Sequence, residues 1–154
     1  MDCLQSPIGL VWVETHGEVL ASIWFDNHCS SNGSDFRPSP SSYTDRVCRQ
    51  LDDYFAGRLQ SFDLSLKRMG TPFQRQAWAE LLKIPYGQTI SYSDQATAMG
   101  RSRAVRAVAN ANGANPFPIV IPCHRVIQKD GRQGGYSAGI EKKEWLLNHE
   151  RHHV

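Results

Sequence analysis

The sequence predicts a mixed α/β (α+β) protein in two parts, a small sheet with one helix followed by a helical part. Three observations predict this fold class. Two runs rich in β-branched and aromatic residues stand near the N-terminus, at residues 9–16 and 19–26. Apolar residues recur at helical spacing over residues 43–55. Helix-capping patterns then dominate from residue 71 onward, so the sheet belongs to the first part of the 154-residue chain.

The N-terminal part is predicted to span residues 1–69 and to follow a β-β-α-β order. The segments at residues 9–16 and 19–26 form a hairpin, because His16-Gly17-Glu18 between them favours a turn. Residues 27–42 are rich in Ser, Asn, Gly and Pro, which predicts a loop.

One helix and one short strand complete this part. The helix begins at Ser41 or Ser42 and ends at Gly57. The alternating segment Phe62–Leu66 predicts a third strand. Residues 67–70 are expected to link this unit to the next.

The C-terminal part, residues 70–154, is predicted to be helical. Thr71 caps a helix that has Pro72 at its first position and continues through Leu82 to Pro85-Tyr86-Gly87. Two shorter helices follow at residues 91–99 and 102–111.

The two shorter helices meet at Gly100-Arg101 and form a candidate helix-turn-helix, although most such pairs only build a core. The second of them carries almost only small side chains besides Arg103 and Arg106, which are three residues apart and are expected on one face. A slim helix that projects arginine suits the narrow minor groove of DNA. Close packing inside the protein is the alternative interpretation.

The net charge of +2 conceals an asymmetry between the two parts. Residues 1–69 contain six basic and nine acidic side chains, a net charge of −3. Residues 70–154 contain eleven basic and six acidic side chains, a net charge of +5. The second part therefore has the sign that suits a polyanion such as nucleic acid. A solvated surface with scattered charge explains the same numbers equally well.

The sequence shows no pattern typical of export or of membrane insertion. The longest apolar run, residues 116–123, is eight residues long and contains three prolines, whereas a membrane-spanning helix needs about 20 residues. Four cysteines are too few for a disulfide framework in a chain of this length. We expect reduced thiols, no membrane partner, and a cytoplasmic location, or a nuclear one in a eukaryote.

A proline-rich segment, residues 115–126, presents the pair Cys123-His124. Apolar surroundings alone would raise the pKa of a thiol and leave it inert, so a reactive Cys123 needs a neighbour that favours the thiolate. Adjacent side chains rarely face each other, and His124 is therefore expected to act through a water or a backbone bend. An acid from the stretch Glu144–Glu150 would orient its ring. The alternative is that Cys123 is a small core residue.

The segment Pro122-Cys123-His124-Arg125-Val126 resembles the active-site signature of the methylated-DNA–protein-cysteine methyltransferases, the O6-alkylguanine-DNA alkyltransferases. Six further motifs match that family in order and near its spacing. The resemblance is strong over residues 71–151 and only general over residues 1–69. The six motifs are Thr71-Pro72-Phe73-Gln74, Ser91-Tyr92, Arg106-Ala107-Val108, Asn115-Pro116, Gly135-Tyr136-Ser137 and Lys143-Glu144-Trp145-Leu146-Leu147.

The resemblance implies a ribonuclease-H-like N-terminal unit and a winged-helix-like C-terminal domain with a DNA-binding helix-turn-helix. It also implies direct-reversal repair, in which the alkyl group of O6-alkylguanine, and of O4-alkylthymine, passes irreversibly to Cys123. Each molecule would act once, after the nucleotide has flipped out of the duplex. The implied partner is double-stranded DNA, bound through its minor groove by a monomer, with no cofactor.

The resemblance further implies the catalytic residues. Cys123 resembles the alkyl acceptor, His124 the water-linked base, and Glu150 the acid that orients it. Asn115 resembles the residue that braces the active-site turn, and Tyr92 the donor to guanine N3.

Other positions resemble residues that hold the base and the DNA. Arg106 resembles the side chain that fills the stack after the base has left, a role for which a planar guanidinium is suited. The remaining positions fall into a base pocket and a set of DNA-backbone contacts. The base pocket comprises Tyr136, Ser137 and the backbone of Val126, and the backbone contacts are Gln74, Ser93 and Arg101.

Some family members bind a structural zinc ion in their N-terminal part. Here Cys3, His28 and Cys29 are the nearby candidates, and their spacing does not make a four-ligand site, so we predict no metal. Two other functions remain open from the sequence. One is a helix-turn-helix module that only recognises alkylated DNA, and the other is a cysteine hydrolase that uses Cys123 and His124.

Overall fold

The computed structural model describes residues 2–26 and 42–154 and confirms the mixed α/β fold class. The chain forms two compact units, Met1–Arg68 and Met69–Val154, which divide one residue before the expected boundary. The zinc candidates His28 and Cys29, and the loop predicted at residues 27–42 except for its last residue, lie outside the described residues.

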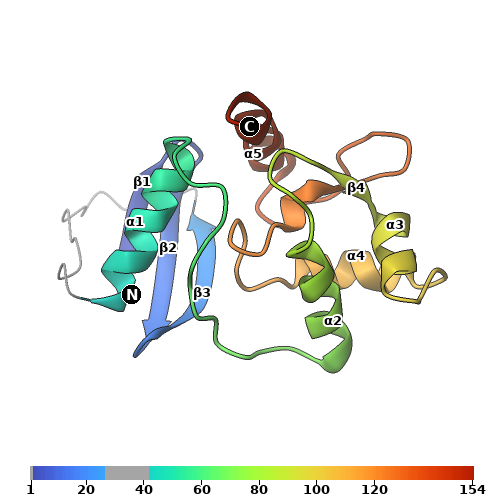
Figure 1. Ribbon diagram of the computed structural model, residues 1–154, viewed down its shortest axis with the longest axis horizontal. Coiled ribbons are helices and arrows are strands. Elements are labelled where there is room, and N and C mark those ends of the chain that lie inside the picture. The colour runs from blue at the N-terminus through green and yellow to red at the C-terminus, as the bar shows by residue number, and fades with distance from the viewer. Residues whose placement is uncertain (1, 27–41) are drawn as a thin grey trace. The chain divides into compact units, whose positions relative to one another are not determined.

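The first unit contains a three-stranded antiparallel sheet of strands β1 (Asp2–Ser6), β2 (Gly9–His16) and β3 (Val19–Asp26), in the order β1-β2-β3 (Figure 1). The predicted hairpin of β2 and β3 is confirmed. Val13 pairs with Ile23 in it, and both side chains are buried. Their alternation with more exposed neighbours is typical of a sheet with one face in the core.

Helix α1 (Tyr43–Phe55) covers one face of this sheet (Figure 1). Ser42 caps it, because its hydroxyl accepts a hydrogen bond of 3.0 Å from the backbone N–H of Asp45. Val47 and Leu51 on α1 are fully buried and supply the other half of the core. The predicted helix is therefore confirmed.

The strand predicted at residues 62–66 is wrong, and β1 is the third strand of the sheet instead. The 62–66 segment makes only one isolated parallel bridge, between Leu66 and Leu20. Side chains of α1 take up other backbone groups of the segment: the Gln50 amide donates to the Asp63 carbonyl at 3.0 Å. β1 was missed because its five residues, Asp-Cys-Leu-Gln-Ser, carry no clear apolar alternation.

The second unit contains four α-helices, a short 3₁₀ helix and a two-stranded parallel sheet among the described residues (Figure 1). The sheet and the 3₁₀ helix, like the last α-helix, were not predicted. The elements are α2 (Pro72–Leu81), β4 (Ile90–Ser91), α3 (Tyr92–Ala98), α4 (Val105–Gly113), η1 (Cys123–Arg125), β5 (Val126–Ile127) and α5 (Ile140–His152).

Helices α2, α3 and α4 pack together through buried polar contacts as well as apolar ones. The Trp78 indole on α2 donates to the Ala111 carbonyl on α4 at 2.8 Å. The side-chain amides of Gln95 on α3 and Asn112 on α4 donate to each other at 2.9 and 2.7 Å. Because buried amides are costly unless they are satisfied, these contacts define how α4 sits against its neighbours.

Helix α4 begins at Val105, three residues after its predicted start. Six residues separate it from the end of α3, and Gly100 at φ +69° terminates α3 as predicted. Arg103 therefore precedes the helix, and its expected place on one helical face with Arg106 is wrong. In this connection the backbone N–H of Ala104 donates to the Arg101 carbonyl at 2.8 Å. The chain therefore makes a turn at residues 101–104 before α4 begins.

Candidate active site

Cys123 opens η1 and is almost completely buried, with 7% of its surface exposed. Val126, which follows η1, pairs in parallel with Ile90 on β4. Because β4 leads directly into α3, this pairing brings Tyr92 at the start of α3 to the same pocket as Cys123. Tyr92 and Cys123, which are 31 residues apart in the sequence, thus line the same pocket.

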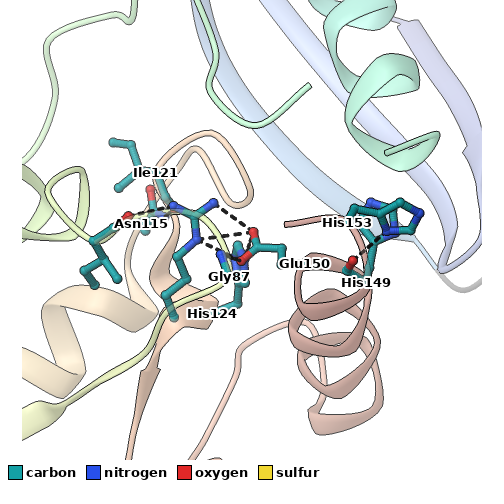
Figure 2. A network of polar contacts seen from close by, with 9 residues as sticks. Gly87, Asn115, Ile121, His124, His149, Glu150 and His153 are labelled. Atoms are coloured by element: carbon teal, nitrogen blue, oxygen red, sulfur yellow. Dashed lines mark hydrogen bonds and ion pairs between the residues drawn. The ribbon is translucent and has the colours of Figure 1, made fainter. Parts of the chain in front are cut away.

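The turn before Cys123 is braced by Asn115 (Figure 2). Its side-chain N–H donates to the Ile121 carbonyl at 2.8 Å, and its side-chain oxygen accepts from the Phe117 backbone at 2.9 Å. Ile119 within this turn has φ +73°, a region that a β-branched residue adopts only under strain. Asn115 therefore holds a strained segment that ends at the thiol.

His124, Arg125 and Glu150 form a buried network (Figure 2 shows His124 facing Glu150). His124 Nε2 lies 2.7 Å from Glu150 Oε1. The Arg125 guanidinium donates to both carboxylate oxygens, at distances between 2.8 and 3.2 Å, and to the Ile84 carbonyl at 2.8 Å. The C-terminal helix α5 is thereby tied to η1.

The charges in this network follow from its contacts. Burial alone would raise the pKa of Glu150, but hydrogen bonds from His124 and Arg125 outweigh it and hold the pKa at about 2. Burial lowers the pKa of His124, so its ring is neutral. Because Nε2 donates to Glu150, Nδ1 is the basic atom of that ring, and it has no hydrogen-bond partner among the described residues.

The thiol itself lies in a site that disfavours charge. Burial raises the pKa of Cys123, and this outweighs the lowering by a hydrogen bond with Asn115 and by the positive charge of Lys143. Burial and the charge of the Cys123 thiolate also raise the pKa of Tyr136 well above its usual range. A reactive thiolate here depends on the few groups that oppose desolvation.

A pocket of about 660 Å³ opens beside Cys123. Five of the predicted site residues line it, together with small residues of α4 and of the 128–137 segment. Val126 is fully buried and does not line the pocket. The predicted residues in its lining are Tyr92, Arg106, Cys123, Tyr136 and Ser137.

Tyr92 is held against the glycine pair Gly134-Gly135 on one wall of this pocket. Its hydroxyl donates to the Gly135 carbonyl at 3.4 Å. Gly134 has φ +70°, and a Cβ atom there would lie 3.0 Å from the Tyr92 ring and hydroxyl. The positive φ and the close approach of the ring thus both favour glycine at position 134.

The residues expected to contact the DNA backbone lie away from the pocket lining. Arg101 is exposed, with its guanidinium 5.5 Å from the centre of the Phe73 ring. The Ser93 hydroxyl lies 3.1 Å from that of Ser91. Gln74 completes the cap of α2, because its side-chain oxygen accepts from the Thr71 backbone at 2.9 Å.

Sequence reasoning missed two charged residues of the site, Arg125 and Lys143. Both are buried, and both hold other site residues in place. Helical spacing was a usable signal for Lys143, because it places Lys143 and Glu150 on the same helix face as Leu146 and Leu147. The signal for Arg125 was weaker and consisted only of its position directly after Pro122-Cys123-His124.

Metal and membrane features are absent from the ranges that the structure describes. Residues 2–26 and 42–154 contain no cluster of three or more His, Cys, Asp or Glu side chains placed to hold a metal ion. No helix in these ranges is long and apolar enough to cross a membrane.

The chain is similar in sequence to known proteins over nearly its full length. A family model described as the DNA-binding domain of 6-O-methylguanine DNA methyltransferase matches residues 72–152. A probable methylated-DNA–protein-cysteine methyltransferase of Acanthamoeba polyphaga mimivirus is 41% identical over 155 residues, which cover 98% of this chain and 96% of the relative. The methylated-DNA–protein-cysteine methyltransferase of Mycobacterium tuberculosis is 42% identical over 149 residues, which cover 96% and 90%.

Solved structures show the same similarity in three dimensions. The crystal structure of Mycobacterium tuberculosis OGT in complex with DNA matches with a TM-score of 0.86 and 41% identity, over 99% of this chain and 92% of the other. An O6-methylguanine DNA methyltransferase from Methanococcus jannaschii matches with a TM-score of 0.70 and 27% identity, over 97% and 93%.

Proposed function

The chain belongs to the family of methylated-DNA–protein-cysteine methyltransferases, and from this premise we propose that Cys123 is its alkyl acceptor. The family function is direct reversal of DNA alkylation, and the chain is accordingly a DNA-repair methyltransferase that binds DNA. The observation that carries the assignment is the position of Cys123, a buried thiol at the wall of a pocket that Tyr92 and Arg106 also line.

The proposed step is a single displacement at carbon. The Cys123 thiolate attacks the alkyl carbon on O6 of guanine, a C–S bond forms, and the C–O bond breaks with its electron pair passing to the base. The base takes up one proton and leaves as ordinary guanine. A thioether has no easy route back to the thiol, so each molecule acts once.

His124 is the proposed acceptor of the thiol proton, through one intervening water. Its Nδ1 is the basic atom of a neutral ring, and the bond from Nε2 to Glu150 fixes that tautomer. Asn115 acts on the backbone, because its two hydrogen bonds hold the turn that delivers Cys123.

The base is proposed to enter the pocket between Tyr92 and Tyr136. The Tyr92 hydroxyl is proposed to exchange its 3.4 Å bond to the Gly135 carbonyl for one to guanine N3, to which it would donate as negative charge develops on the leaving base. Ser137 and the Val126 backbone are proposed to complete the recognition of the base. O4-alkylthymine is proposed as a second substrate of the same pocket.

DNA is proposed to bind through its minor groove to α3 and α4, which would act as the helix-turn-helix. O6 of a paired guanine is inside the duplex, so the nucleotide has to flip out before it reaches a buried thiol. Arg106 on α4 is exposed at the pocket and is proposed to fill the stack behind the base. Gln74, Ser93 and Arg101 are the proposed phosphate contacts.

The protein is proposed to act as a monomer, in the cytoplasm or, in a eukaryote, in the nucleus. The positive charge of residues 70–154 supports binding to a polyanion in either compartment.

Intact mass spectrometry after mixing with a duplex that contains O6-methylguanine tests the proposed function. We expect every molecule to become heavier by one methylene group and the reaction to stop when protein is consumed. Binding without a mass change would instead indicate a module that only recognises lesions. Repair of more lesions than there are protein molecules would indicate a hydrolase, and either result would overturn single-use transfer to the protein.

A further inference from the structure

Lys143 on α5 is a fully buried lysine whose ammonium group is aimed at main-chain carbonyls of the active-site region. Its Nζ atom donates to the carbonyl of Val126 at 2.7 Å and to that of Gly135 at 3.3 Å, and it also contacts the carbonyl of Gln133. These carbonyls lie at the end of η1 and on the rim of the pocket. One side chain therefore joins α5 to both segments that enclose Cys123.

The ammonium group of Lys143 has no carboxylate within ion-pair distance among the described residues. A buried cation that meets only neutral dipoles is costly, so an anion nearby would relieve it. The charge of Lys143 lowers the pKa of the Cys123 thiol and also that of the His124 ring. Lys143 also lies 5.7 Å from the centre of the Tyr92 ring, the second wall of the same pocket.

Electrostatic coupling between the two side chains runs in both directions. Burial lowers the pKa of Lys143, the Cys123 thiolate opposes part of this lowering, and the resulting pKa is about 8. Burial raises the pKa of Cys123, and the charge of Lys143 lowers it. In the resting protein His124 does not supply this charge, because burial lowers its pKa and the ring is neutral until it accepts the thiol proton.

We propose that Lys143 is a positioning residue that provides the buried positive charge for the Cys123 thiolate and holds the pocket rim around it. The two tasks use the same atom. Three carbonyl acceptors fix Nζ in place, and a fixed charge in a dry site stabilises an anion more than a mobile solvated one does.

Other charged and titratable groups lie near Lys143 and Cys123 and could also affect the pKa of the thiol. Tyr92 and Tyr136 line the pocket, and burial raises the pKa of each, so both remain neutral near pH 7. Arg125 and Glu150 lie behind η1 and are paired with each other. Lys143 is therefore the cation whose removal should change the titration of the thiol most.

The test measures the reactivity of the thiol and needs no DNA. The rate at which iodoacetamide alkylates Cys123 is followed by peptide mass spectrometry from pH 6 to pH 10, in wild type, Lys143→Met and Lys143→Arg. Lys129→Met is the matched control, because Lys129 is exposed and the charge change is the same. The thiolate is the species that reacts, so the rate profile reports its pKa.

We expect the Lys143→Met profile to move to higher pH, with a rate about tenfold lower at pH 7, as one unit of pKa implies. Lys143→Arg should recover part of the rate, and Lys129→Met should match wild type. A Lys143→Met protein that is folded and has an unmoved profile would overturn the proposal.

A second measurement covers the case in which Lys143→Met does not fold. The side-chain amine of Lys143 is titrated by nitrogen NMR in wild type and in Cys123→Ser. The proposal requires a lower pKa for Lys143 in Cys123→Ser, because the thiolate that supports the ammonium is gone. Equal titrations would contradict it. Neither measurement depends on alkyl transfer, so failure here is distinguishable from failure of the proposed function.

Discussion

His124 Nε2 lies 2.7 Å from Glu150 Oε1, and the two side chains are 0% and 1% exposed. The same carboxylate accepts three hydrogen bonds from Arg125. One buried acid therefore orients the imidazole next to the reactive thiol and also neutralises a buried guanidinium. The orientation of the proposed base and the attachment of α5 thus depend on a single side chain.

Glu150→Gln should lower the free energy of unfolding by roughly 3–5 kcal/mol, because it leaves the Arg125 charge buried without a counter-ion. Urea unfolding at pH 7 measures the loss. Glu141→Gln, an exposed position on the same helix, is the matched control and should cost less than about 1 kcal/mol. Equal effects at positions 141 and 150 would contradict the buried network.

Stability should decline in acid because of the same residue. Glu150 has its pKa lowered from 4.5 to about 2 in the folded protein, so its contribution is complete above pH 4.5 and is lost as the pH falls toward 2. Urea unfolding between pH 6 and pH 3 should show a steeper decline in wild type than in Glu150→Gln. Parallel declines would show that another group titrates in this range.

The sequence predicted those helices and strands that carry a clear local pattern, such as apolar alternation or a capping residue. The β2–β3 hairpin and α1 were predictable from alternation, a glycine turn and a serine cap. The strand at residues 62–66 was wrong, because alternation cannot show that side chains of α1 bind its backbone. The β4–β5 pair was not predictable, since two-residue strands carry too little pattern and pair across 35 residues of sequence.

The site was predictable where the chemistry lies within one segment. Cys123 and His124 stand out by residue type and by their prolines, and family resemblance suggested Glu150. What the sequence could not give was burial. It does not show that His124 is a neutral side chain at 0% exposure, or that Lys143 is aimed at the pocket rim. These facts depend on how α5 packs against η1, a contact between distant segments.

Gly134→Ala should slow alkyl transfer several-fold, because its Cβ would press on the Tyr92 ring and hydroxyl. The positive φ adds a cost of about 1 kcal/mol for a residue that has a Cβ atom. Gly131→Ala isolates this cost, since Gly131 has φ +88° and nothing within 4 Å of the added atom. Transfer rates and unfolding free energies of both variants are measured. If both lose stability alike and transfer at equal rates, the contact with Tyr92 has no role.

Arg106→Ala should react almost normally with free O6-benzylguanine and slowly with O6-methylguanine in duplex DNA. Flipping costs a few kcal/mol of stacking, and each 1.4 kcal/mol that is not compensated slows the reaction about tenfold. Lysine at this position should rescue only in part, because it has no flat stacking surface.

Arg103→Ala is the matched control for Arg106, because it removes the same charge from an exposed residue that precedes α4. Single-turnover rates on both substrates give the comparison. Equal losses of Arg106→Ala on free base and duplex would mean that Arg106 supports the fold or the thiol, and the stacking role would be dropped.

The location of the transferred group tests the central claim most directly. A duplex with an isotope-labelled methyl group on guanine O6 is mixed with wild type and with Cys123→Ser, and the digested proteins are mapped by peptide mass spectrometry. We predict one label per wild-type molecule, all on the Cys123 peptide, and none on Cys123→Ser, which should still bind the duplex. Label on Cys3, Cys29 or Cys48, or transfer that persists in Cys123→Ser, would contradict the account.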